Sequence, residues 1–150
     1  MKPVCVTISS TIDRDGMEEK EVIQQTVTGQ FENKEERWFL RYREQEGTEE
    51  ETRTTVKANH DEVVLIRHGA ISYRQTYRPG SKSSSLMKIP NGTVEMIVHT
   101  HTYERTLVDG RGVISFSFAL TVGEEALGEY RLKIEWMEVS DLDECVGKGA

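Results

Sequence analysis

A tyrosine and a glutamate near residue 40 are the first side chains in this sequence with the chemistry of a binding site. Tyr42 and Glu44 have the same parity as Trp38 and Leu40, so all four point to one side of a strand. If that side is the interior of a barrel, the Glu44 carboxylate needs a cation, because an unpaired buried charge is costly. Arg67, which follows an apolar strand, is the candidate partner.

Two interpretations of this polar group stay open. An arginine inside a small barrel can hold a ligand carboxylate or phosphate through its two-pronged donor geometry, with the Tyr42 hydroxyl assisting. Alternatively, Glu44 and Arg67 only pair with each other and close the barrel end, which we favour for the pair itself because a fold alone does not grant a function.

A histidine pair is the second candidate. In a regular strand, His99 and His101 lie on one face together with Tyr103 and Arg105, close enough to share a metal ion if a third ligand joined them. No third ligand follows from the sequence, and the charge of Arg105 disfavours a cation. We therefore expect an exposed histidine pair, with a metal-dependent enzyme as an alternative.

The charges of the chain are unevenly distributed. The net charge is −7, which argues against a general binder of nucleic acids or anionic membranes. The segment 63–94 carries five Arg and Lys residues and no acidic residue, leaving −12 on the rest of the chain because −12 + 5 = −7. Tyr73 and Tyr77 share one strand face while Arg74 and Arg78 share the other, so we do not expect nucleic acid to bind there. An anionic partner should be sought along residues 63–94.

No catalytic or cofactor signature is present. The sequence has no nucleophile elbow, phosphate loop or HExxH motif, so we expect no cofactor and no catalysis. Cys5 and Cys145 lie far apart in the chain, and a bridge between them would tie the tail to the first strand. Because no secretion signal or membrane helix is visible, we expect a cytoplasmic protein with two reduced cysteines.

Short alternating segments between turn signals position these candidates. Val, Ile, Thr, Tyr, Phe and Trp number 48, whereas Ala and Leu number 13, which is typical of an all-β protein. Turns are expected at Asp15-Gly16, Asn91-Gly92 and Asp109-Gly110, and residues 81–85 are expected to form a mobile loop. The predicted strands are 4–9, 22–31, 37–45, 52–58, 63–66, 71–78, 86–89, 93–108, 113–122 and 129–139.

These strands predict a single antiparallel up-and-down β-barrel of about eight to ten strands, with a two-sheet sandwich as the alternative. The barrel domain covers residues 1–140, and a polar tail covers 141–150. A homodimer through exposed strands is left open. A structural or partner-binding barrel filled solid by large aromatic side chains is the alternative function; those side chains are Trp38, Phe116, Phe118 and Trp136.

Over residues 4–139 the chain resembles a known bacterial family. The motifs that carry the resemblance are LRYRE at 40–44, TTVK at 54–57, RHGA at 67–70, NG at 91–92 with Thr100, RGVIS at 111–115 and VG at 122–123. It is similar to the YwiB-like family of small proteins of unknown function, which implies a lipocalin-like (calycin) barrel and a bacterial cytoplasmic protein.

The matching positions complete the candidate site. Tyr42, Glu44, Lys57, Arg67 and Thr100 match the family pattern, and His99 and His101 depart from it. We expect the polar side chains to line one end of an apolar interior that binds a small anionic or amphipathic molecule.

Overall fold

Ten antiparallel strands follow one another in space in the same order as in the sequence, from β6 through β1 and β10 to β7. The computed structural model describes residues 1–14, 19–140 and 145. Within these residues, no helix is long and apolar enough to cross a membrane. The strands are β1 (Lys2–Asp13), β2 (Glu21–Lys34), β3 (Arg37–Glu44), β4 (Thr52–Ala58), β5 (Val63–Gly69), β6 (Tyr73–Tyr77), β7 (Lys82–Ile89), β8 (Gly92–Val108), β9 (Arg111–Val122) and β10 (Glu125–Glu138).

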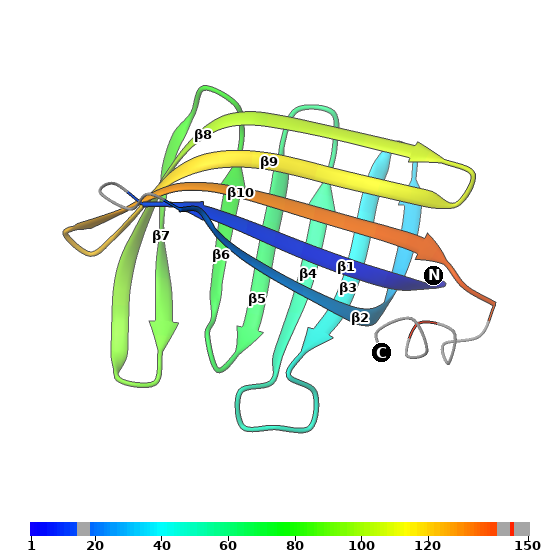
Figure 1. The fold of residues 1–150 in the computed structure, drawn as a ribbon, viewed down its shortest axis with the longest axis horizontal. Coiled ribbons are helices and arrows are strands. Elements are labelled where there is room, and N and C mark those ends of the chain that lie inside the picture. The colour runs from blue at the N-terminus through cyan, green and yellow to red at the C-terminus, as the bar shows by residue number, and fades with distance from the viewer. Residues whose placement is uncertain (15–18, 141–144, 146–150) are drawn as a thin grey trace.

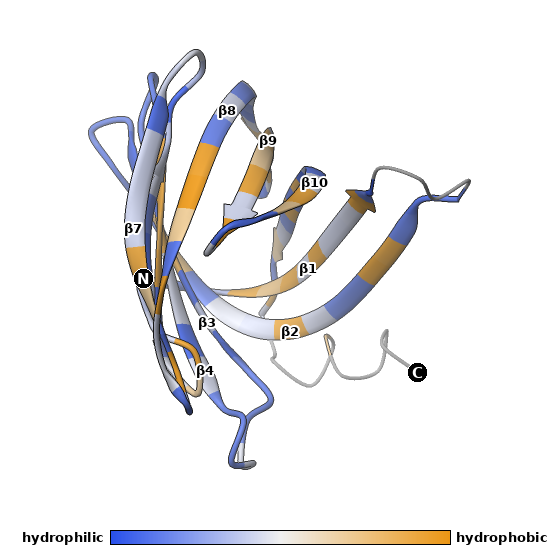
Figure 2. Cartoon of the chain, turned by 90° about the vertical axis from the view of Figure 1, so that its left-hand side faces the viewer, coloured by the Kyte–Doolittle hydropathy of each residue, from blue (hydrophilic) through white to orange (hydrophobic). Residues whose placement is uncertain are grey.

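The sheet curls into a nearly closed barrel, which confirms the predicted fold. In Figure 1, β8, β9, β10 and β1 run across the view, whereas β3 to β6 cross them at a steep angle. The long, curved β2 connects these two sets of strands, because it pairs with β1 on one side and with β3 on the other (Figure 2). At Gly29 it lies so close to β3 that a Cβ atom would come within 2.6 Å of the Arg41 carbonyl oxygen. Glycine therefore permits the close approach of these strands.

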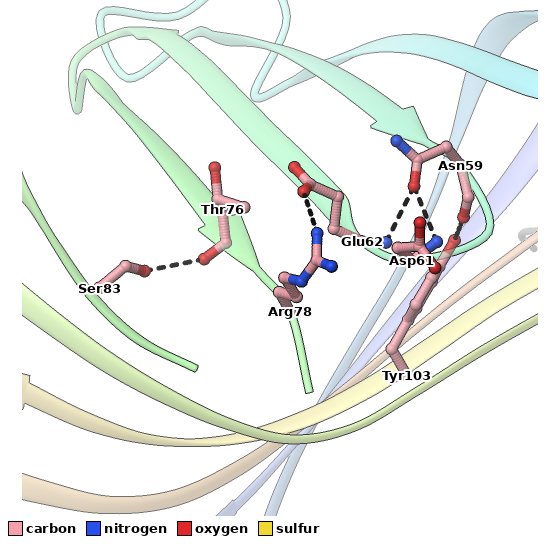
Figure 3. A network of polar contacts seen from close by, with 7 residues as sticks. All are labelled: Asn59, Asp61, Glu62, Thr76, Arg78, Ser83 and Tyr103. Atoms are coloured by element: carbon pink, nitrogen blue, oxygen red, sulfur yellow. Dashed lines mark hydrogen bonds and ion pairs between the residues drawn. The ribbon is translucent and has the colours of Figure 1, made fainter. Parts of the chain in front are cut away.

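The barrel closes between β6 and β7 without a continuous ladder. Ser72 and Lys88 exchange two backbone hydrogen bonds of 3.0 and 2.7 Å at one end of this junction. Further along, the Ser83 hydroxyl donates to the Thr76 carbonyl oxygen at 3.1 Å (Figure 3). The Gln75 amide donates to Ser83 Oγ at 2.6 Å. Beyond Ser72 and Lys88, side-chain hydrogen bonds therefore hold the two strands together at this junction.

The loop predicted at residues 81–85 is wrong, because most of this segment forms the first half of β7. Its serine hydroxyls satisfy Gln75, which is almost fully buried at 1% exposure. Ser85 Oγ donates to Gln75 Oε1 at 2.7 Å, and Ser83 accepts from the same amide. Small polar side chains are required here because a buried amide without partners would be costly.

One half of the barrel is filled by aromatic side chains. The ring of Trp136 lies 4.8 Å from that of Phe31 and 5.7 Å from that of Trp38. The Arg105 guanidinium covers this cluster at 4.3 Å from the Trp38 ring, and it donates to the Ala58 carbonyl oxygen at 3.2 Å. This cation on an aromatic face closes the end of the barrel.

The turn between β4 and β5 is held against the same end. Asn59 Oδ1 accepts hydrogen bonds from the backbone N–H groups of Asp61 and Glu62 (Figure 3). The Tyr103 hydroxyl, from β8, donates to the Asn59 carbonyl oxygen at 2.6 Å. Contacts from opposite sides of the barrel thus close this end.

The structure corrects the expected state of the cysteines. Cys5 and Cys145 form a disulfide, with Cα atoms 5.2 Å apart. Both are buried in a small cluster with Val139, and the Cys145 sulfur lies 3.5 Å from the Val27 carbonyl oxygen. The expectation of reduced thiols rested on compartment and not on geometry. The rest of the predicted tail at 141–150 and the turn predicted at Asp15-Gly16 lie outside the described residues.

Replacing Gly112 with alanine should destabilise the packed half. Gly112 faces Trp136 across the β9–β10 ladder, and a Cβ atom there would collide with the indole. We expect the free energy of unfolding to fall by about 2–3 kcal/mol, because the ring must leave its packed position. Urea denaturation followed by Trp fluorescence measures the change. Ser115→Ala on the same strand is the control; a loss below about 0.5 kcal/mol in Gly112→Ala would contradict this packing.

Candidate functional site

The inward face of β3 carries the polar residues predicted from the sequence. Trp38, Leu40 and Tyr42 are buried, with 5%, 1% and 5% exposure, and the Glu44 side chain is 12% exposed. The alternation therefore persists to the end of the strand and places a carboxylate inside the barrel. This confirms the predicted orientation of β3.

The Glu44 carboxylate is held by side chains from three other strands. Arg67 Nη2 donates to Oε2 at 2.7 Å, and Thr54 Oγ1 donates to the same oxygen at 3.0 Å. Gln25 Nε2 donates to Oε1 at 2.7 Å. The expected Glu44–Arg67 pair is therefore present, with both carboxylate oxygens satisfied.

The position of Gln25 explains how the barrel opens near this pair. The ladder between β2 and β3 ends at Gly29 and Tyr42. Beyond that point the two strands are not paired, and the hydrogen bond from Gln25 to Glu44 bridges them. A side-chain bond therefore spans the place where the ladder stops.

Arg67 remains charged in this environment. Burial acts to lower the pKa of its guanidinium, but Tyr73 and Glu44 more than offset this and hold the pKa above its ordinary value. The guanidinium carbon lies 5.8 Å from the centre of the Tyr73 ring. Its side chain is 25% exposed, so solvent or a ligand can reach it.

A cavity of about 250 Å³ lies in the half of the barrel that the aromatic cluster leaves unfilled. Arg67 and Glu44 border it together with Tyr42, Tyr73 and Tyr77. The wall is otherwise largely apolar and includes Ile8, Leu65, Met96, Phe118, Leu120 and Leu132. Its size is slightly below the usual range for ligand pockets, roughly 300–1,000 Å³.

The polar pair separates this cavity from a hollow on the outside. The outer hollow has a volume of about 470 Å³ and shares Gln25, Glu44 and Arg67 with the cavity. Loop residues such as Gln45 and Ile71 complete its wall. The charged groups therefore lie at the boundary between the largely apolar cavity, called the chamber from here on, and the protein surface.

Two predicted site residues lie elsewhere. Lys57 is exposed, and the buried neighbours Val56 and Ala58 show that it points out of the barrel. It therefore does not contribute to the polar end of the interior. Thr100 is buried at 1% exposure, but it is absent from the cavity wall as the described residues define it. Its backbone instead bonds to Gly80 and Ser81.

A β-bulge corrects the predicted face of the histidines. The β8–β9 register shifts between Thr100 and Thr102, so inward positions are even before the bulge and odd after it. His99 and His101 are exposed, whereas Tyr103 and Arg105 turn inward. The prediction that all four share one face is therefore wrong.

The two histidine rings contact each other, and His101 also contacts a carboxylate. Their ring centres lie 5.1 Å apart, and His101 Nε2 is 2.8 Å from Glu129 Oε2. Among the residues that the structure describes, no group of three potential metal ligands exists. The pair is the exposed surface feature expected from the sequence.

The cations of segment 63–94 do not gather in one place. Arg67 lies inside, whereas Arg74, Lys82 and Lys88 are exposed, and Arg78 pairs with Glu62 at 3.3 Å (Figure 3). The stretch of sequence without acidic residues therefore marks no single anion site. Strand pairing distributes its charges between the interior and the surface.

Gln25 and Thr54 are partners of Glu44 that the sequence-based prediction did not include. Thr54 has the parity of buried Val56, and Gln25 has the parity of Val27 and Phe31. Parity alone would have placed both side chains inside. Polar residues at inward positions of neighbouring strands are the signal that could have found them.

The buried tyrosines predict a loss of stability at alkaline pH. Burial raises the pKa of the Tyr42 and Tyr77 hydroxyls well above the ordinary value of 10.0. Below pH 10 both the folded and unfolded chains keep these protons. Above it only the unfolded chain ionises readily, so each tyrosine lowers the free energy of unfolding by about 1.4 kcal/mol per pH unit. In urea denaturation between pH 9 and 11, Tyr42→Phe should show the shallower decline; equal slopes would contradict this.

Comparisons with known proteins place this geometry in a family. A solved structure, the crystal structure of ywiB protein from Bacillus subtilis, superposes with a TM-score of 0.80 at 24% identity and covers 93% of both chains. The uncharacterized beta-barrel protein YwiB of Bacillus subtilis (strain 168) is 28% identical over 123 residues, which are 82% of this chain and 84% of that protein. The model of a domain of unknown function, DUF1934, matches residues 6–134. The chain therefore belongs to the DUF1934 family of β-barrel proteins, whose function is unknown.

Proposed function

We propose that the barrel binds a small amphipathic molecule without catalysing a reaction. The observation that carries the proposal is the 250 Å³ cavity, which is mostly apolar and has a charged arginine at its boundary. The apolar part of the ligand occupies the chamber between Leu65, Phe118 and Leu132. An anionic head lies at Arg67, where it can reach the outer hollow.

Arg67 has donor capacity for such a head. A guanidinium carries five N–H groups, and the hydrogen bond to Glu44 leaves from Nη2. A carboxylate, sulfonate or phosphate oxygen can therefore bind Arg67 beside the existing pair. The Tyr73 ring packed against the guanidinium supports its orientation.

Glu44 has an opposing role in this proposal. It compensates the charge of Arg67 when the chamber holds no anion, and Gln25 and Thr54 fix its position. The same carboxylate repels an anionic head. The ligand must therefore gain much of its affinity from burying its apolar part.

Two further expectations stay proposals. A structural or partner-binding barrel with a solid core is the alternative function, and the packed cluster of Phe31, Trp38 and Trp136 favours it for one half of the molecule. A cytoplasmic location is the second. The Cys5–Cys145 disulfide argues against a cytoplasmic location, because disulfides are rare in that compartment.

A titration with fatty acids of different chain lengths tests the binding proposal. Displacement of 1-anilinonaphthalene-8-sulfonate, checked by calorimetry, should give a Kd of about 1–100 μM for at least one chain length. Arg67→Met should weaken binding about tenfold or more, because the head loses a charged donor. Leu120→Trp should abolish binding by filling the chamber while leaving the arginine in place.

Arg74→Met is the matched control, since it removes the same charge from an exposed position on β6. Thermal unfolding checks that each variant is folded. The proposal fails if no acid in the series binds the wild type, or if Arg67→Met and Arg74→Met weaken binding equally. The first result would favour the solid, structural barrel.

Glu44→Gln should separate stability from affinity. Without the carboxylate, Arg67 keeps a partly buried charge with no counter-charge, so we expect the free energy of unfolding to fall by about 1–3 kcal/mol. The same change removes a repelling charge, so an anionic ligand should bind more tightly than to the wild type. Urea denaturation and calorimetry measure the two effects. Weaker binding of a fatty acid by a folded Glu44→Gln variant would show that the head does not lie at Arg67.

A further inference from the structure

A second hollow, of about 540 Å³, lies on the outer face of the barrel and is lined by three arginines. Arg41 and Arg43 come from β3, and Arg53 comes from β4. All three are exposed, on the side of the strands opposite the chamber. Thr28 and Thr55 add hydroxyl groups to its wall. We call this hollow the arginine groove.

The arginines are placed so that their charges repel. Arg43 and Arg53 are direct partners in the β3–β4 register, and like charges at such positions destabilise a sheet. Arg41 lies two residues away on the same face. Within the described part of the chain, the carboxylate that lines the groove belongs to Glu46; its Oε1 lies 3.8 Å from Arg43 Nη1, and both side chains are at least half exposed. Such an exposed contact compensates little charge.

Fold geometry also isolates the groove from the proposed interior site. Tyr42 and Thr54 contribute to both walls, but their side chains are buried at 5% and 2% exposure. The three arginines border the groove and not the chamber. A ligand of the groove would therefore contact a different set of cations from a ligand of Arg67.

We propose that the arginine groove binds a small molecule that carries two or more phosphoryl groups. Among the residues that the structure describes, three guanidinium groups on two neighbouring strands offer more positive charge than the Glu46 carboxylate can balance. A diphosphate or triphosphate distributes several negative charges over a length comparable to the spacing of the arginines. One guanidinium group can donate two parallel hydrogen bonds to two oxygens of a phosphate. The hydroxyls of Thr28 and Thr55 can donate to further phosphate oxygens.

Single-stranded nucleic acid fits the groove less well, although it carries the same phosphates. Proteins that bind single strands stack bases on exposed aromatic side chains. The aromatic residue among the described residues of the groove wall is Tyr42, which is 95% buried and belongs to the interior. The net charge of −7 also opposes a long polyanion that extends beyond the groove.

Calorimetric titration of the full chain with sodium tripolyphosphate tests this proposal at low salt, where the contacts are least screened. The wild type should bind, and tripolyphosphate should raise its Tm because the ligand binds the folded chain. Arg43→Gln and Arg53→Gln should each weaken binding about tenfold. Neither should lower the Tm without ligand, since each removes a repulsion between cations.

Two controls give the experiment its specificity. Arg74→Gln makes the same change in charge at an exposed position of β6 outside the groove, and Arg67→Met removes the interior cation. Both should keep the wild-type affinity within about twofold, which also makes the result independent of the fatty-acid proposal. Oligothymidylate of ten nucleotides provides the nucleic-acid comparison.

Three outcomes would overturn the proposal. The first is no binding of tripolyphosphate by the wild type. The second is an equal loss of affinity in Arg74→Gln and in the two groove variants, which would indicate unspecific attraction. The third is tighter binding of the oligonucleotide than of tripolyphosphate, with the same dependence on Arg43 and Arg53, which would assign the groove to nucleic acid.

Discussion

A carboxylate inside an apolar barrel must find donors, and the arrangement of four strands depends on this requirement. Glu44 on β3 receives hydrogen bonds from Gln25 on β2, Thr54 on β4 and Arg67 on β5. Thr54 and Arg67 are direct partners in the β4–β5 register. A slip by one residue in either strand would turn a donor to the outer face and leave a buried charge unpaired. The polar cluster therefore favours one register among those that the apolar pattern allows.

The interior is divided into a packed half and a hollow half, and the same cluster borders the hollow half at the protein surface. Phe31, Trp38 and Trp136 fill one end, with Arg105 above them. Toward the other end the side chains no longer meet, and a cavity remains. The barrel therefore combines a stabilising core with a chamber, and neither a purely structural nor a purely ligand-binding description fits the whole interior.

The alternation of apolar and polar residues along the strands predicted most of the fold and part of the candidate site. The inward placement of Tyr42 and Glu44 follows from parity alone, and so does the partnership with Arg67 once the strands are paired in sequence order. Lys57 entered the candidate site through the family resemblance, whereas its parity, opposite to that of Val56 and Ala58, agrees with its outward position.

Other features depend on contacts that the sequence does not display. The bulge after Thr100 turns the side chains of Tyr103 and Arg105 to the inner face, and no nearby glycine or proline in the sequence indicates the bulge. The serine-rich segment of β7 resembles a loop in composition, yet it is required to satisfy Gln75 across the junction. The arginine groove is likewise a product of strand pairing, since Arg53 is ten residues from Arg43 in the chain.

The junction between β6 and β7 has a consequence for how the barrel can change its circumference. Every other pair of neighbouring strands is joined by a backbone ladder over at least part of its length. At this junction the bonds come largely from the side chains of Gln75, Ser83 and Ser85, and such groups can exchange a protein partner for water at modest cost. Widening the barrel to hold a molecule larger than the chamber would therefore cost less along this line than across a backbone ladder.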